Sequence, residues 1–279
     1  MGLDRGLTGC GIMSGMSGSR ETNRMRPEDL RFDRYSPGPH LSRFVRNYWT
    51  LQAADGNGLC GRQHVTPDGC IDIIFRRRTP TEAFTAFVVG AMTRPIFEDL
   101  APRAEYLGIR LAPGGFGHFF RVPAGELTDR IVPLEYLSAP SRLIEAVANA
   151  PDRRTRLLAI EEGLGRWLRS TEPEPILAAA LDTLLASGGM VSVVRLARLA
   201  GRSPRHLQRV FRERVGVGPK LFCRIIRFKG ALHTLRHRPQ PDLLQVALEA
   251  GYYDQAHFIH DFDRFYGSSP STVCRDRGF

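Results

Sequence analysis

Two copies of one pattern, a short helix, a glycine turn and a second helix, lie at residues 191–215 and 242–266. On both sides of each turn the apolar residues recur with the spacing of an amphipathic helix, and the turns fall at Gly201 and Gly251. Between the copies, residues 219–236 carry a further apolar stripe, long enough for a helix of about 27 Å. The duplication predicts an all-α C-terminal region of two similar helix-turn-helix units joined by a linker helix.

The second helix of the first copy has a polar outward face. Ser203 is placed to cap this helix and Pro204 to begin it. Leu207, Val210 and Phe211 share one side, which we expect to face the partner helix. The other side holds the side chains that we expect to read DNA bases: Arg205, Gln208, Arg209 and Arg212. Arginine can bind the two acceptors of guanine in the major groove, and glutamine can pair with adenine.

The second copy has a less basic outward face. Asp254 is placed to cap its second helix. The exposed or edge positions predicted to face the bases hold Gln255, His257, Ile259 and His260. Asp261 and Asp263 share the helix, and carboxylates near DNA phosphates weaken binding. We therefore expect a subordinate unit that reads DNA shape or contacts protein. An alternative for His257 is a core position beside Asp254.

At these residues the sequence resembles the C-terminal DNA-binding domain of the AraC/XylS transcription regulators, over about residues 176–274. The first copy carries the resemblance in Ala197, Gly201, Ser203, His206, Leu207, Gln208, Arg209 and Phe211. The second carries it in Ala247, Gly251, Tyr252, Tyr253, Asp254, Gln255, His257, Phe258, Phe262 and Arg264. The turn at 267–270 matches the end of the family's signature. A single helix-turn-helix pattern is weak evidence, but two in tandem at this separation make a specific match.

The resemblance implies a transcription regulator that binds double-stranded DNA and contacts RNA polymerase. It also implies that the residues matching Arg205, Gln208 and Arg209 face the bases, in agreement with the helical spacing. The family often has basic residues where this chain has His260 and Asp263, which is a further reason to expect a weaker second unit.

Charge is distributed unevenly between the two copies. Residues 192–238 hold 13 basic side chains and one acidic one, whereas residues 242–279 hold 3 basic and 6 acidic. A local excess of this size favours nucleic-acid binding by the first copy and the linker. The candidate phosphate contacts are Ser203, Arg224 and Arg227. The two linker arginines have an alternative, since long arginine stems also cover apolar cores.

The N-terminal half has a different pattern, of short extended segments separated by Pro and Gly. Strands are expected at 44–51, 70–75, 84–89, 106–111 and 131–134, and helices at 141–148 and 153–169. The fold class is thus α+β: a mixed, strand-rich small barrel or sandwich with following helices, then the all-α C-terminal domain. We divide the chain into a disordered tail (1–26), a strand-rich sensory or dimerisation domain (27–170), a linker (171–175) and a DNA-binding domain (176–279).

The role of the N-terminal domain is less constrained. It resembles, more loosely, a domain of some AraC-type regulators, through Tyr48, Trp49, the segment 67–69 and the segment 111–115. That resemblance implies a sensory or dimerising role. The apolar stripes of the helices at 141–169 fit a homodimer contact and packing on their own domain equally well. A sensory role would allow a small-molecule effector. The residues do not specify that effector, the operator sequence or the direction of regulation.

Composition and cysteine spacing argue against catalysis. The five cysteines, at 10, 60, 70, 223 and 274, lack the clustered spacing of a zinc site, and we expect reduced thiols, no cofactor and no metal. No apolar run approaches a membrane span, so with reduced thiols a cytoplasmic protein is expected. No GxSxG, HExxH or P-loop pattern appears, so we expect a protein that is not an enzyme. Two alternatives remain. A DNA-repair protein that transfers methyl groups would need a metal-held cysteine thiolate, and a protein-interaction module would lack DNA affinity.

Overall fold

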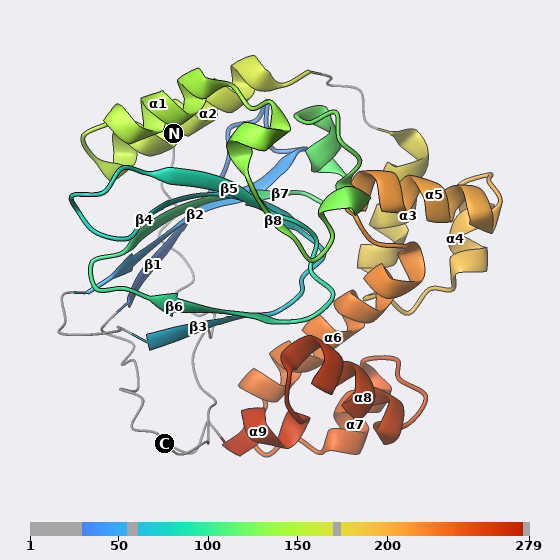
Figure 1. Cartoon of the computed structure of the whole chain (residues 1–279). Coiled ribbons are helices and arrows are strands. Elements are labelled where there is room, and N and C mark those ends of the chain that lie inside the picture. Colours follow the sequence, from blue (N-terminus) through green and yellow to red (C-terminus); the bar gives the residue numbers. More distant parts are fainter. Residues whose placement is uncertain (1–29, 55–60, 170–173, 276–279) are drawn as a thin grey trace.

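The computed structural model describes residues 30–54, 61–169 and 174–275, and Figure 1 shows a sheet domain beside a group of helices. The predicted tail, most of the linker at 171–175, and Cys10 and Cys60 lie outside the described residues.

The strands of the sheet domain form one larger sheet and one separate ribbon. In chain order they are β1 (Leu30–Tyr35), β2 (Val45–Ala53), β3 (Gly61–Val65), β4 (Ile71–Arg77), β5 (Thr85–Val89), β6 (Ile96–Leu100), β7 (Glu105–Leu111) and β8 (Ile131–Pro133). Six of them make an open antiparallel sheet in the order β1-β2-β7-β4-β5-β8, and β3 pairs with β6. The expected strand-rich domain is confirmed, with an open sheet where a small barrel or sandwich was predicted.

The middle of the sheet is formed by β4 and β7, which pair with Ile73 opposite Ile109. Both strands are largely buried and contain several large apolar residues, which explains why their sequences predict them well. Gly108 of β7 is required by a close contact, because a Cβ atom there would lie 1.9 Å from the indole of Trp49. The glycine thus lets the Trp49 ring lie flat against the neighbouring strand.

Three strands were not predicted, β1, β3 and β6. They are five or six residues long and carry charged side chains, such as Arg62 in β3 and Asp99 in β6. Each lies at an edge of the sheet or in the ribbon. The apolar alternation that marks a half-buried strand is therefore weak in them.

Two helices, α1 (Ser141–Asn149) and α2 (Arg153–Trp167), cover one face of the sheet (Figure 1). Asp152 caps α2 by accepting a hydrogen bond from the backbone of Thr155. Their apolar stripes join the core of the sheet through Leu143, Val147, Ile160, Leu164 and Trp167. Of the two expectations for this helix pair, packing on its own domain is the one that the described residues show. Short 3-10 turns at Gly115–His118, Ala124–Leu127 and Leu134–Leu137 connect the sheet to these helices.

The C-terminal region is helical, as predicted. Its helices are α3 (Pro175–Ala186), α4 (Val193–Leu199), α5 (Pro204–Val215), α6 (Pro219–His237), α7 (Leu243–Glu249), α8 (Gln255–Tyr266) and α9 (Pro270–Arg275). The first helix-turn-helix unit is α4 with α5, the second is α7 with α8, and α6 joins them (Figure 1). The 19 residues of α6 span about 28 Å.

Of the three apolar cores in the described residues, the two larger ones divide the C-terminal region unequally. The larger core runs from the sheet through α3, α4 and α5 and ends in α6 at Phe222 and Cys223. The second core begins in α6 at Ile225 and contains α7, α8 and α9. The first unit is therefore packed into the sheet domain, whereas the second has a core of its own.

Candidate nucleic-acid interface

The first unit presents α5 with the orientation that the sequence predicts. The Ser203 hydroxyl accepts a hydrogen bond from the backbone of His206, which caps α5, and Pro204 occupies its first turn. Leu207, Val210 and Phe211 are buried. The opposite side is polar, and among the described residues it leaves Arg205, Arg209 and Arg212 exposed and Gln208 half-buried.

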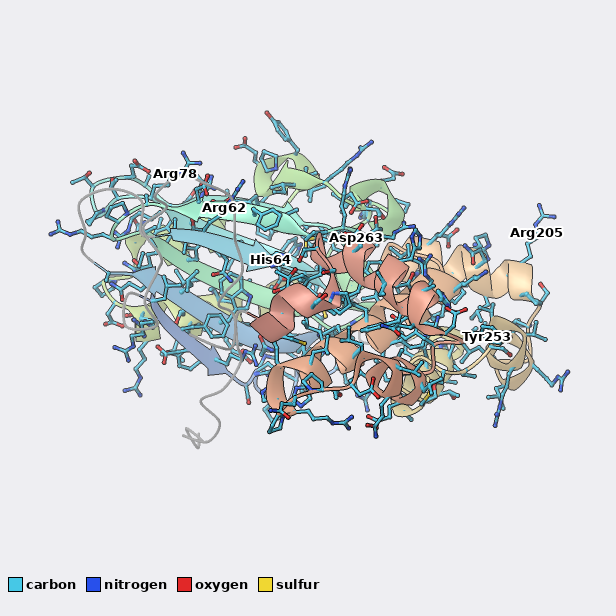
Figure 2. All side chains as sticks on the ribbon, turned by 90° about the horizontal axis from the view of Figure 1, so that it is seen from below. Arg62, His64, Arg78, Arg205, Tyr253 and Asp263 are labelled. Carbon is cyan, nitrogen blue, oxygen red and sulfur yellow. The ribbon has the colours of Figure 1, made fainter. Side chains whose placement is uncertain are left out.

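The side chains of this face differ in their exposure and in their contacts. Arg205 projects into solvent from the start of α5 (Figure 2). Arg209 forms an exposed ion pair with Glu213, with Nη1 3.0 Å from Oε1. Such a pair is weak, so a DNA base or phosphate can replace Glu213 at small cost. Gln208 lies over the turn that leads to α6, because a Cβ atom at Gly218 would be 2.3 Å from its amide nitrogen.

The two second helices, α5 and α8, share one register. Each has 12 residues, begins after a capping side chain (Ser203 or Asp254) and ends at a glycine with positive φ (Gly216 or Gly267). Aligned by their caps, the positions of Arg205, Gln208, Arg209 and Arg212 correspond to Ala256, Ile259, His260 and Asp263, all four of them exposed. Where the first unit offers three cations and an amide, the second offers a methyl group, an isoleucine, a histidine and a carboxylate.

The register separates the residues predicted to read bases on α8. Ile259 and His260 lie on the face equivalent to that of α5. Gln255 is half-buried at the first position of the helix. The partly exposed ring of His257 lies against Tyr252, with centroids 5.2 Å apart, so it does not occupy the core position considered for it. Sequence reasoning did not assign Ala256 to this face, although the cap at Asp254 contains the signal that could have found it.

Asp261 does not lie on the outward face of α8, contrary to the expectation of a carboxylate close to phosphates. It is fully buried and occupies the α8 position that corresponds to Val210 in α5. Both of its oxygens accept hydrogen bonds from Arg224 of α6, with Nε 3.1 Å from each. These hydrogen bonds, together with the charge of Asp261, raise the pKa of Arg224 above its ordinary value. Asp263 is exposed, as expected (Figure 2).

The predicted phosphate contacts fall into two groups. Ser203 is exposed at the start of α5, where backbone amides attract anions. Arg224 is bound to Asp261, and Arg227 donates a hydrogen bond to the carbonyl of Gly251 at 2.8 Å while its guanidinium lies over Tyr252. The geometry therefore favours the alternative for the two linker arginines, in which they attach the second unit to α6. The assignment of all three to phosphate stays a prediction.

Tyr253 is a candidate that sequence reasoning missed. The turn of the second unit is one residue longer than that of the first, since Gly251 is three residues before its helix cap and Gly201 is two residues before its own. Tyr253 lies in the longer turn, directly before Asp254, and is 90% exposed. Figure 2 shows its ring projecting from the surface. An exposed aromatic ring beside α8 would suit contact with a sugar or a base.

Two buried thiols among the described residues, those of Cys70 and Cys223, do not fit a nucleophile. Burial and the nearby charge of Asp68 raise the pKa of Cys70 to about 12, and burial raises the pKa of Cys223 to about 11. A thiol with so high a pKa is protonated and inert near neutral pH. In the same part of the chain, His, Cys, Asp and Glu side chains do not gather in a group that could hold a metal ion. None of its helices is long and apolar enough to cross a membrane.

Comparison with known families divides the chain into two matched segments. Residues 33–133 match a domain of unknown function, DUF6597, and residues 196–276 match a helix-turn-helix domain. The HTH-type transcriptional regulator GlxA of Rhizobium meliloti is 39% identical over 105 residues, which are 37% of this chain and 32% of that protein. The HTH-type transcriptional regulator MtrA of Neisseria gonorrhoeae is 34% identical over 88 residues, or 31% of this chain and 29% of that protein. The chain thus spans about a third of the length of these relatives.

Solved structures give similar matches. A transcriptional regulator with an AraC-type DNA-binding domain from Chromobacterium violaceum is 23% identical and covers 37% of this chain and 93% of that one, with a TM-score of 0.35. Apo ToxT from Vibrio cholerae is 10% identical and covers 91% of this chain and 99% of that one, with a TM-score of 0.40. The family model and the two relatives confirm the resemblance predicted for the C-terminal region. The chain carries an AraC-type helix-turn-helix domain at residues 196–276, behind an N-terminal DUF6597 domain at residues 33–133.

Proposed function

We propose that the chain is a cytoplasmic, non-catalytic transcription regulator that binds a specific double-stranded DNA sequence. The observation that carries the proposal is the outward face of α5, with Arg205, Arg209 and Arg212 exposed and Gln208 beside them. An α-helix fits the major groove, and these side chains carry the donors that distinguish guanine and adenine. The two relatives, both HTH-type transcriptional regulators, support the proposal.

In this proposal the two units contribute unequally. The face of α5 reads bases and supplies most of the affinity through its cations. The face of α8, with Ile259, His260 and Asp263, contributes apolar contact and recognition of DNA shape. Gln255, His257 and Tyr253 add contacts at its start. RNA polymerase is the expected protein partner, and the N-terminal domain is proposed to modulate DNA binding in response to an effector or to a second copy of the chain.

The alternative of a protein-interaction module has one observation in its favour. The first helices of both units expose apolar side chains, Val194 and Leu199 in α4 and Leu244 and Leu248 in α7. Such side chains suit a protein contact. They do not account for the cationic face of α5, which is why DNA binding is preferred.

The test is selection of binding sites from random duplex DNA by the full chain, followed by titration of the selected site. We expect specific binding that weakens steeply with salt, because cations of α5 release counterions from DNA. Arg205→Ala should weaken it by about 1–3 kcal/mol and relax the sequence preference at one base position. Arg78→Ala removes an exposed arginine of the sheet domain, far from α5 in Figure 2, and is the matched control. Failure to enrich any sequence, or equal losses in both variants, would contradict the proposal.

A further inference from the structure

The first unit is held by the sheet domain at the end of α5. Thr128 donates a hydrogen bond to the carbonyl of Gly216 at 2.6 Å. A Cβ atom at Gly125 would lie 2.9 Å from the carbonyl oxygen of Arg212, and one at Gly216 would lie 2.9 Å from Ala91. Because this contact adjoins the shared apolar core, α5 is anchored to the sheet domain.

Within the described residues, the core of the second unit does not include sheet side chains, so the position of this unit depends on α6 and on surface contacts. The core of the second unit begins at Ile225, inside α6. Gly230 follows in the same helix, exposed and with open space around the position of a Cβ atom. Glycine in a helix interior costs about 1 kcal/mol relative to alanine. Unsupported, α6 would let the second unit shift relative to the first.

The ribbon of β3 and β6 supplies one support. The His64 ring of β3 stacks on Phe97 of β6, with centroids 4.7 Å apart, and meets the ring of Tyr266 edge-on at 4.4 Å. Tyr266 is the last residue of α8. Pro95, just before β6, packs beside Gly267, where a Cβ atom would be 3.2 Å from its ring. The ribbon therefore contacts α8 directly at its C-terminal end.

The ribbon is attached to the sheet, so its contact with α8 can fix the position of α8 relative to the sheet domain. Glu98 of β6 accepts hydrogen bonds from Arg76 of β4 at 3.0 Å and from the hydroxyl of Tyr106 in β7 at 3.2 Å. Leu100, at the end of β6, is buried in a small core with β2 and β7 side chains. A contact at the ribbon is thus a contact with the sheet domain.

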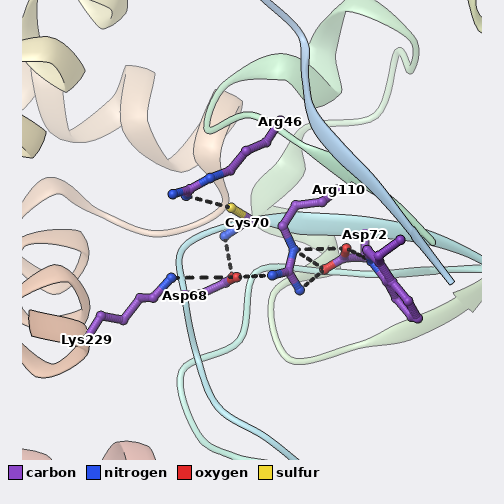
Figure 3. A network of polar contacts seen from close by, with 7 residues as sticks. Arg46, Asp68, Cys70, Asp72, Arg110 and Lys229 are labelled. Atoms are coloured by element: carbon purple, nitrogen blue, oxygen red, sulfur yellow. Dashed lines mark hydrogen bonds and ion pairs between the residues drawn. The ribbon is translucent and has the colours of Figure 1, made fainter. Parts of the chain in front are cut away.

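A buried polar network supplies a second support (Figure 3). Asp68, in the loop before β4, lies 3.0 Å from Arg110 of β7 and 4.0 Å from Lys229 of α6. The amide of Cys70 donates a further hydrogen bond to Asp68 at 2.9 Å. Lys229 lies in the half of α6 that carries the second core. The network therefore holds the same part of the molecule that the ribbon holds.

We propose that the β3–β6 ribbon, through His64 and Phe97, fixes the position of α8 relative to α5 and thereby sets the spacing between the two DNA segments that the chain accepts. This inference rests on the proposed function. Two reading helices held rigidly tolerate few changes in the number of base pairs between their segments, because each added base pair rotates and displaces the second segment. Releasing α8 from the ribbon relaxes that requirement without altering either reading face.

The test compares the full chain with His64→Ala and Phe97→Ala, two ribbon variants outside the DNA-facing helices. Asp99→Ala, which removes an exposed ion pair with Arg62 inside the ribbon, is the control. Duplexes of the selected site are prepared with one or two base pairs inserted or deleted between the two segments. We expect the wild type and the control to lose about tenfold in affinity per change, within the usual range for coupled sites, and the two ribbon variants to lose much less. Affinity for the segment read by α5 alone should be equal in all four.

Hydrogen exchange provides a readout that needs no DNA. In the ribbon variants the amides of α7 and α8 should exchange faster, while those of α4 and α5 keep the wild-type rate. Spacing preferences equal to those of the wild type in both folded variants, or equal acceleration of both units, would overturn the inference alone. A wild-type chain that selects no DNA sequence would overturn the proposed function and the spacing role with it.

Discussion

The buried carboxylate of Asp261 determines the role of its neighbour Arg224. In α5 the equivalent of Asp261 is Val210, a core residue. The carboxylate in α8 keeps the buried position and requires a cation, which α6 supplies in Arg224. A buried charge without a partner is costly, whereas an apolar pair of similar volume is often neutral or stabilising. Arg224, which from the sequence is a candidate phosphate contact, thus pairs with a buried carboxylate.

This pairing predicts a non-additive response. Arg224→Leu should lower the free energy of unfolding by about 3 kcal/mol, the lower end for a buried pair, because the edge of the arginine reaches solvent. Arg224→Leu combined with Asp261→Val should recover most of that loss, since it restores the residue type that α5 has at this position. Denaturant unfolding of the full chain measures both. Arg238→Leu, which breaks an exposed pair with Glu249, is the control and should cost little. A double variant as unstable as the single one would refute the account.

At the scale of elements, α5 and α8 are the same helix with different outward faces. Both have the same length, a capping side chain and a terminal glycine. Asp263 stands where α5 has Arg212, so in the proposed complex it would repel the phosphates that Arg212 would attract. We therefore expect that replacing Asp263 with a cation raises the low DNA affinity that we propose for the second unit.

Asp263→Arg should strengthen DNA binding and make its salt dependence steeper by about one counterion, as expected for one added phosphate contact. Titrations at several salt concentrations measure both effects. Glu162→Arg makes the same charge change on α2, on the other side of the sheet from α8 in Figure 1, and should leave the slope unchanged because distant charges are screened. Equal effects of the two substitutions would point to net charge rather than to the face of α8.

How far the sequence predicts an element depends on how locally its signal is encoded. The helix-turn-helix units follow from periodicity, caps and glycines within 25 residues, so their bounds agree with the structure to within a residue or two. The ribbon of β3 and β6 has polar, five-residue strands and was missed. The partners of Arg224 and Arg227 were also beyond prediction, because Asp261 and Gly251 are at least 24 residues away and meet them only after the helices pack.

At the scale of the whole molecule, the contact between the ribbon and α8 has a built-in response to acid. Burial, followed by the charge of Arg236, lowers the pKa of His64 from its ordinary 6.5 to about 4. The folded chain thus binds a proton at His64 less readily than the unfolded chain does. The contribution of His64 to stability is complete above about pH 6.5 and falls as the pH drops toward 4.

The response can be isolated with His64→Phe, which keeps an aromatic ring against Tyr266 and removes the titrating group. We expect the melting temperature of the wild type to fall more than that of the variant between pH 7 and pH 4.5, with the difference growing below about pH 6.5. Melting curves of both proteins at matched ionic strength test this. Parallel pH profiles would show that His64 titrates alike in the folded and unfolded chains.

The apolar core that joins the sheet to α3, α4 and α5 limits how the chain can be truncated or fused to another domain. A fragment beginning at α3 would expose the faces of Leu177, Leu181 and Val215 that the N-terminal half covers. That fragment would be prone to aggregate, and grafting a foreign N-terminal half would require a matching apolar face. A substitution on one side of this contact therefore constrains which residues the other side can carry.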